Sequence, residues 1–96
     1  MAEYRLSPLA EADLEAIWRY TADKWGVSQA NLYQDTLTTA FIRLAAAPQT
    51  APSCDHIRPG YRCSFVEQHT IYFRTAKHGI SIVRILHQRM DTVRLL

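Results

Sequence analysis

Apolar residues recur every three or four positions through the first half of the chain, which is the spacing of amphipathic helices. The first run follows Ser7, which can accept hydrogen bonds from the free amides of a first helical turn, and Pro8, which suits the first helical position. The run reaches Trp25, and Gly26 can then end the helix in a left-handed conformation. The pattern therefore predicts a helix of about 16–18 residues between Ser7 and Gly26.

A second helical stripe runs from Ala30 to Ala45, and Pro48 ends it. Ser28 offers an N-cap for this second helix. Because a link of about three residues joins the two helices, we expect them to be antiparallel neighbours in a helical hairpin.

The last third of the chain changes to the alternating period of β-strands. Apolar and polar residues alternate over 61–66 and 71–74, and a nearly continuous β-branched run covers 80–86. A short mixed stretch, residues 3–6, is predicted as one more strand. The last strand is apolar on both faces, so we place it centrally, beside the N-terminal strand.

The order strand, helix, helix, strand, strand, strand predicts an α+β fold, with one mainly antiparallel sheet covered by the helical hairpin. The 96 residues are 48% hydrophobic and 21% charged, which suits a single folded domain over 1–96. No apolar run is long enough to span a bilayer, and the first residues do not resemble a signal peptide. We therefore expect a cytoplasmic protein without a membrane partner.

Two cysteines, Cys54 and Cys63, are too few for a disulfide framework, so we expect reduced thiols. His56 lies close to Cys54, but the spacing of these three residues does not match a zinc site. No phosphate-binding loop or paired-carboxylate signature is present. The sequence predicts neither a metal nor a cofactor.

Charge is divided unevenly along the chain. Residues 1–48 carry four basic and six acidic groups, whereas residues 49–96 carry seven basic and three acidic groups and all four histidines. The net charge of +2 is small for a protein that binds nucleic acid directly. Arginines dispersed among apolar residues favour an acidic protein partner over sequence-specific nucleic-acid binding.

Several segments, in this order and spacing, resemble the ParE/RelE superfamily of bacterial toxins from type II toxin–antitoxin systems, over nearly the whole chain. The resemblance is closer to the ParE branch. The segments that carry it are Tyr4-Arg5-Leu6-Ser7, Ala12-Asp13-Leu14, Ile17-Trp18, Tyr20, Trp25-Gly26, Arg58-Pro59-Gly60-Tyr61-Arg62, Ile71-Tyr72-Phe73-Arg74, Val83-Arg84-Ile85-Leu86-His87 and Gln88-Arg89-Met90-Asp91.

The resemblance implies a toxin that a cognate ParD-like antitoxin neutralises in a hetero-oligomer. A ParE-like member is expected to inhibit DNA gyrase by protein–protein binding, and so to block replication. A RelE-like member would instead cleave messenger RNA on the ribosome without a metal, with Arg84, His87 and Arg62 as its catalytic residues. RelE-like nucleases carry a C-terminal Tyr or His–Tyr, but no Tyr follows His87, so the gyrase inhibitor is favoured. A toxin fold that only binds a partner is a third alternative.

Two arginine positions have both a structural and a functional interpretation. Arg62 and Arg74 occupy polar-face positions of neighbouring strands, where cross-strand pairing would place them close together. Glu67 or Asp55 would neutralise them, or they would bind an anionic partner.

Arg84 interrupts an apolar strand and needs a partner when buried. The structural hypothesis is a salt bridge to Asp91 or Glu3, and the alternative is contact with antitoxin or nucleic acid. His87 also has a structural and a functional interpretation. It either makes a hydrogen bond at the end of the strand or acts as a group that titrates near neutral pH.

Two tryptophans and the C-terminal tail complete the predicted contacts. Trp18 and Trp25 are seven residues apart on one helix face, either packed on the sheet or exposed as anchors for the antitoxin. Val93-Arg94-Leu95-Leu96 is either a docked cap or a contact for the target or the antitoxin. The residues predicted to bind target or antitoxin are Arg58, Arg62, Arg74, Arg84, Arg89, Trp18, Trp25, Leu95 and Leu96.

Overall fold

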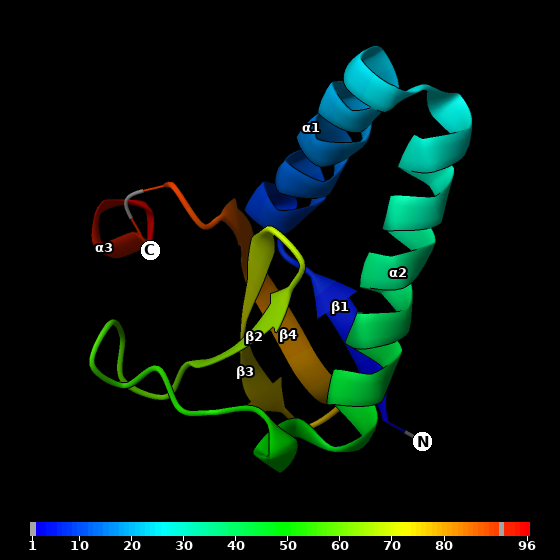
Figure 1. The fold of residues 1–96 in the computed structure, drawn as a ribbon. Coiled ribbons are helices and arrows are strands. Elements are labelled where there is room, and N and C mark those ends of the chain that lie inside the picture. The colour runs from blue at the N-terminus through cyan, green and yellow to red at the C-terminus, as the bar shows by residue number, and fades with distance from the viewer. Residues whose placement is uncertain (1, 91) are drawn as a thin grey trace.

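A helical hairpin and a four-stranded sheet make up most of the computed structural model, which describes residues 2–90 and 92–96. The two hairpin helices follow the first strand directly, and the other three strands form the last third of the chain (Figure 1). In chain order the elements are β1 (Glu3–Leu6), α1 (Pro8–Trp25), α2 (Val27–Ala46), a 3₁₀ turn (Pro48–Thr50), β2 (Arg62–Val66), β3 (His69–Ala76), β4 (Gly79–His87) and α3 (Thr92–Leu95).

The strands are ordered β1-β4-β3-β2, so β4 is central, as its apolar sequence predicts. It pairs in parallel with β1 and antiparallel with β3, and β2 pairs antiparallel with β3. The α+β fold and the mainly antiparallel sheet are therefore confirmed. Neither hairpin helix, nor any other helix in the described part of the chain, is long and apolar enough to cross a membrane.

Ser7 begins the hairpin as predicted. Its Oγ accepts a hydrogen bond from the Ala10 amide at 3.0 Å and donates one to the Val83 carbonyl at 2.7 Å, which fixes the start of α1 against β4. The link to α2 differs from the prediction, because Gly26 alone joins the helices and Ser28 lies inside the first turn of α2. A φ of 97° at Gly26 reverses the chain in one residue, so no serine cap is needed.

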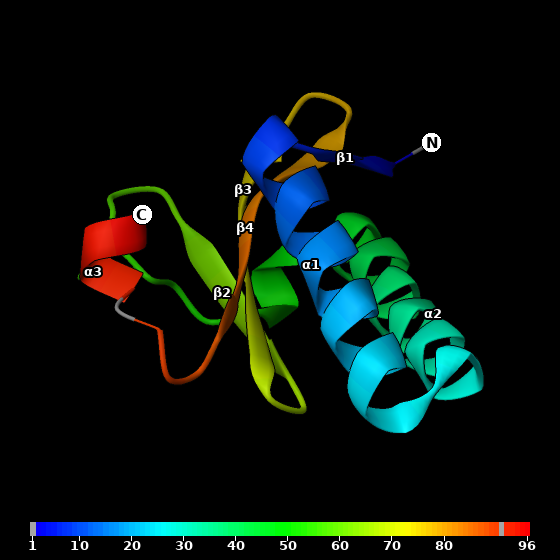
Figure 2. The same cartoon turned by 90° about the horizontal axis from the view of Figure 1, so that it is seen from above.

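The hairpin covers one face of the sheet, and the segment between α2 and β2 together with α3 lies on the other (Figure 2). The stripe predicted for the second helix is confirmed as core. The buried core residues on the hairpin side are Ala10, Leu37, Ala40, Phe41, Leu44, Ala45, Ala51, Val66, Ile71, Phe73, Ile80, Ile82 and Ile85.

On the opposite face, a second cluster contains Cys54, Cys63, Tyr72 and Leu86, with Leu96 packed against it. Cys54 and Cys63 form a disulfide in this cluster, so the expectation of reduced thiols is wrong. The Cys54 amide donates to the Tyr61 carbonyl at 2.7 Å, and the loop between the two cysteines closes on itself. This closure places the two Cα atoms 6.1 Å apart, within the range that a disulfide spans.

A β-bulge interrupts the pairing of the two longest strands. Tyr72 pairs with Arg84 and Phe73 pairs with Ile82, so Val83 has no partner across the β3–β4 ladder. A bulge shifts the side-chain alternation by one residue. Arg84 therefore lies on the face opposite to Ile82, away from the core beneath the hairpin.

Candidate functional site

A groove runs between α1 and the end of the sheet at which β2 meets β3 and β4 ends. It consists of two hollows, of ≈ 520 Å³ and ≈ 500 Å³, that share Tyr20, His69 and His87. We call the two hollows together the α1 groove. Its lining is largely aromatic and apolar toward α1 and polar at the β2–β3 turn, which suits a peptide with one apolar and one polar face.

Three side chains from three elements meet in the α1 groove. The Tyr33 hydroxyl on α2 lies 2.6 Å from His69 Nδ1 on β3, and the rings of His69 and His87 meet edge to face with centroids 5.3 Å apart. The register explains this pair, because His69 and His87 stand directly opposite each other in the β3–β4 ladder. His69 is the first residue of β3, whereas the predicted alternation begins only at residue 71, so His69 was not among the predicted site residues.

Burial changes the acid–base behaviour of this cluster. Desolvation, with a smaller contribution from Glu67, raises the pKa of Tyr33 to about 12. Desolvation also lowers the pKa of His69, and the nearby His87 lowers it further. His69 is therefore neutral at physiological pH and acts in the groove as a hydrogen-bonding group.

Arg84 pairs with Asp13 on α1, which corrects the predicted partners: Glu3 pairs with Arg5 instead, and Asp91 lies outside the described residues. Because β1 ends at Leu6, the edge of β4 beyond Ile82 is open, and α1 runs beside it. There the Asp13 carboxylate accepts a hydrogen bond from the Ile85 amide at 3.0 Å. It also accepts hydrogen bonds from two N–H groups of Arg84, at 2.7 and 2.8 Å. The hydrogen bond from Arg84 to Asp13 raises the arginine's pKa.

The C-terminal tail docks on the face of the sheet opposite the hairpin. The hydroxyl oxygens of Tyr72 and Thr92 lie 3.1 Å apart, and Arg84 Nη1 donates to the Leu95 carbonyl at 3.3 Å. Leu96 packs on the second cluster, whereas Leu95 is exposed. The docked-cap interpretation thus fits Leu96, while Leu95 remains available to a partner.

The three residues predicted for RNA cleavage do not form one site. His87 lies on the same face as Ile85, toward the hairpin, whereas Arg84 lies on the opposite face. Arg62 begins β2, at the end of the β2–β3 pairing away from His69, and its Nη1 donates to the Ala51 carbonyl at 2.7 Å. The geometry therefore provides no cluster of cations beside a general base.

The predicted proximity of Arg62 and Arg74 is also wrong. Arg62 pairs with Phe73, so the next residue, Arg74, lies on the opposite face of the sheet. Asp55 is near Arg62, as the sequence suggested. The pKa of Asp55 is lowered mainly by the hydrogen bond from the Gly60 amide, with smaller contributions that include Arg62.

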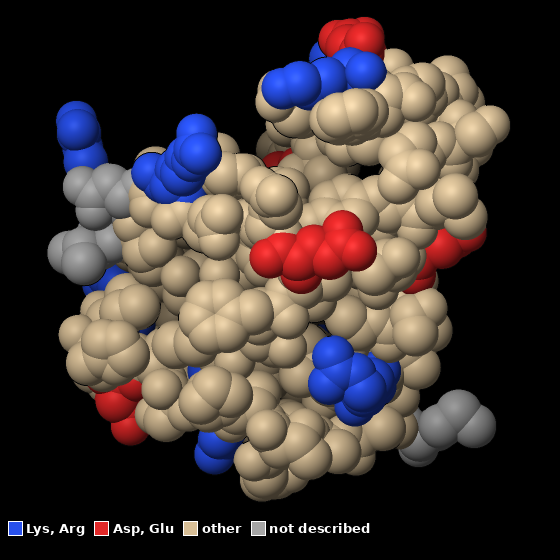
Figure 3. All heavy atoms as spheres, viewed as in Figure 1, with Lys and Arg blue, Asp and Glu red and all other residues tan. Residues whose placement is uncertain are grey.

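The remaining arginines of the predicted site, Arg58 and Arg89, are exposed, as Arg74 is. Figure 3 shows that basic side chains on the face viewed there are scattered among uncharged ones and do not gather in one patch. This distribution agrees with the small net charge and does not resemble a surface for the nucleic-acid backbone.

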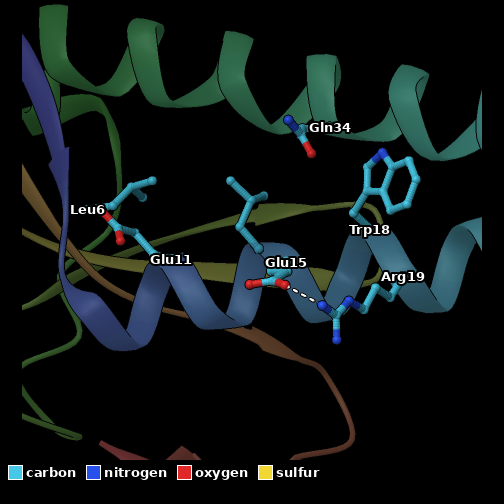
Figure 4. A pocket seen from close by; sticks show the side chains of 7 residues that line it. Leu6, Glu11, Glu15, Trp18, Arg19 and Gln34 are labelled. Carbon is cyan, nitrogen blue, oxygen red and sulfur yellow. Dashed lines mark hydrogen bonds and ion pairs between the residues drawn. The ribbon is translucent and has the colours of Figure 1, made fainter.

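The first interpretation of the two tryptophans was that they pack on the sheet. Neither Trp18 nor Trp25 does so. Trp18 points from α1 toward α2, where its Nε1 donates to Asn31 Oδ1 at 2.9 Å (Figure 4). A hollow of ≈ 450 Å³ lies beside it, with the Glu15–Arg19 ion pair on its rim. Trp25, the last residue of α1, is 68% exposed and lines the α1 groove, so it fits the role of an anchor.

The fold has a counterpart among solved structures. A chain of the chromosomal ParDE toxin–antitoxin system from Pseudomonas aeruginosa matches with a TM-score of 0.78 and 22% sequence identity, covering 91% of this chain and 96% of that one. The chain therefore shares the α+β fold of a protein from a ParDE toxin–antitoxin system.

Sequence comparisons narrow the class to one family. The family model for the ParE toxin of the type II toxin–antitoxin system parDE matches residues 4–92. Toxin ParE1 of Mycobacterium tuberculosis is 49% identical over 96 residues, covering 99% of this chain and 98% of the relative. Toxin ParE1 of Caulobacter vibrioides is 36% identical over 91 residues, covering 95% and 94%. The chain belongs to the ParE toxin family of type II toxin–antitoxin systems, which implies an antitoxin partner.

Proposed function

We propose that this ParE toxin, a single domain over 1–96, inhibits DNA gyrase in the cytoplasm by protein–protein binding and that a ParD-like antitoxin neutralises it. Membership of the ParE family over residues 4–92 carries the proposal. The separation of Arg84, His87 and Arg62 supports it, because an RNA-cleaving site would need these groups together.

The α1 groove is the proposed antitoxin site. Tyr20 and Trp25 are 62% and 68% exposed beside it, and large exposed aromatic side chains are frequent anchors of protein interfaces. An amphipathic helix of the antitoxin would place apolar residues against Ile17 and Ile85 and polar residues against Glu67. Antitoxin binding would cover Trp25, His69 and His87 together.

The target is proposed to contact the opposite side of the molecule, at the C-terminal tail. Leu95 is 41% exposed there. Exposed arginines of the second half of the chain, among them Arg58, Arg74 and Arg89, would add contacts to acidic groups of gyrase.

A supercoiling assay with purified gyrase tests the function. The toxin is expected to stop supercoiling or to trap a gyrase–DNA cleavage complex, and equimolar antitoxin is expected to restore activity. Removing residues 93–96 should abolish inhibition, whereas His87→Ala should leave it unchanged.

Two results would overturn the proposal. A toxin that leaves gyrase active but halts translation, with transcripts cut in ribosomes and with His87→Ala inactive, would be an RNA-cleaving enzyme. A protein that binds antitoxin tightly but affects neither gyrase nor translation would be a binding module without toxicity.

A further inference from the structure

Arg84 connects two parts of the molecule that lie far apart in sequence. Its Nε and Nη2 donate to the Asp13 carboxylate on α1, at 2.7 and 2.8 Å, and its Nη1 donates to the Leu95 carbonyl of the tail at 3.3 Å. The planar guanidinium can serve both acceptors because its donors point in fixed, different directions. One side chain thus joins the hairpin to the C-terminus.

The hairpin side of this link is firmly held. Asp13 also accepts the Ile85 amide at 3.0 Å, and it lies two turns into an 18-residue helix that Ser7 caps. The Asp13 and Arg84 side chains are only 15% and 14% exposed, so little solvent competes with their pairing. The bulge at Val83 turns Arg84 toward the face on which the tail lies.

The tail side docks on the sheet through a short helix and side-chain contacts of its described residues. Its helix, α3, has four residues, too short to be stable alone. Besides the Arg84 hydrogen bond, the contact between Thr92 and Tyr72 and the packing of Leu96 on the second cluster hold the tail. Loss of the Arg84 link would therefore weaken the docking of the tail on the sheet without opening the hairpin core.

We propose that Arg84, oriented by Asp13, is a positioning residue for target binding: it holds residues 92–96 in the orientation in which they contact the target. The inference rests on the proposed function, in which the tail meets gyrase. It assigns Arg84 an indirect role, in place of the direct contact with target or antitoxin that its sequence position suggested.

Two mild variants of the full-length toxin test the inference. Arg84→Lys keeps the positive charge but replaces the several N–H donors of the planar guanidinium by a single ammonium nitrogen. Asp13→Asn keeps an oxygen that can accept from the Ile85 amide but removes the negative charge of the ion pair. Glu15→Gln is the matched control for Asp13→Asn, because it breaks the exposed Glu15–Arg19 pair on the same helix. Leu44→Ala controls for general loss of stability, since Leu44 is fully buried in the hairpin core.

Three measurements are needed on each variant: the concentration for half-inhibition of gyrase, the antitoxin Kd, and the hydrogen-exchange rate of the Leu96 amide, which donates to Thr92. We expect Arg84→Lys and Asp13→Asn to need about tenfold more toxin for half-inhibition and to exchange faster at Leu96. The antitoxin Kd of Arg84→Lys should stay within about threefold of that of the unmodified protein, because Arg84 does not line the α1 groove. Both controls should retain tail protection.

Unchanged exchange at Leu96 in both variants would overturn the positioning role, as would an equal loss of gyrase inhibition and antitoxin affinity in Arg84→Lys. If the unmodified toxin does not inhibit gyrase, the proposed target is wrong, and the exchange measurement alone then decides whether Arg84 positions the tail. Melting temperatures of all variants identify any that fail to fold, and the other of the two mild variants then carries the test.

Discussion

The hydroxyl of Tyr33 lies 2.6 Å from Nδ1 of His69, and this contact joins α2 to the start of β3. The same hydroxyl lies 3.2 Å from the Val66 carbonyl, to which it donates. Tyr33→Phe removes the hydroxyl from both of these partly buried contacts, so we expect the free energy of unfolding to fall by about 1–2 kcal/mol in urea titrations. Tyr20→Phe is the control: its hydroxyl contacts only the exposed Lys24 among the hydrogen bonds of the described chain, and its loss should change stability little.

Stability should also depend on pH through His69. Burial and His87 lower the pKa of His69 in the folded protein below the ordinary 6.5, against a smaller opposing effect of Asp13. The unfolded chain therefore takes up the proton first, and stability falls as pH drops below about 6.5 until the folded state is protonated as well. Melting temperatures between pH 8 and 5 should show this decline, and His69→Gln should reduce it. The same substitution at the exposed His56 should not; an equal effect there would contradict the assignment to His69.

His69 was not among the site residues predicted from the sequence, and the reason is physical. Local signals act over a few residues and can therefore be recognised in the amino-acid sequence. The Ser7 cap and the helical spacing of the core stripe from Ala30 to Ala45 are two such signals. The meeting of His69 with His87 depends on strand register, which long-range packing sets.

Arg84 shows the same limit more clearly. The sequence indicated that it needs a partner but not which one, because Asp13 is 71 residues away and reaches it only where β1 leaves the edge of β4 open. The bulge that turns Arg84 away from the core has no sequence signature among the β-branched residues around it. The disulfide was missed for another reason: the expectation of reduced thiols rested on the small number of cysteines, whereas the pairing follows from closure of the loop between Cys54 and Cys63.

Gly79 is the first residue of β4 and pairs with Glu3, the first residue of β1, in the parallel β1–β4 ladder. A Cβ at this position would overlap the main chain of Glu3, and the φ of 140° is unfavourable for other residues. Gly79→Ala should therefore separate β1 from β4 and lower the free energy of unfolding by about 2–4 kcal/mol, measured by chemical denaturation. Gly60→Ala is the control, since its φ is 83° but its Cβ would meet open space. It should cost only about 1–2 kcal/mol; an equal loss at both sites would mean that backbone conformation alone is responsible.

The disulfide between Cys54 and Cys63 closes a short loop beside the second cluster. Replacing both cysteines by alanine should lower the free energy of unfolding by about 2–3 kcal/mol, because the unfolded chain regains the freedom that the cross-link removed. Urea titrations with and without a thiol reductant provide the measurement. Reductant should destabilise the unmodified protein and leave the double variant unaffected. If reductant has no effect on either protein, the disulfide does not form in solution.

Trp25 is the last residue of α1 and buries little of its surface in the toxin itself. Trp25→Ala should therefore leave the melting temperature nearly unchanged but weaken antitoxin binding by about 2 kcal/mol, roughly thirtyfold in Kd, since the α1 groove loses its largest aromatic anchor. Calorimetric titration of the antitoxin measures this change. Leu32→Ala is the control, because Leu32 is 61% exposed on α2 and does not line the groove. Equal losses of affinity in the two variants would place the antitoxin on the outer face of the hairpin instead.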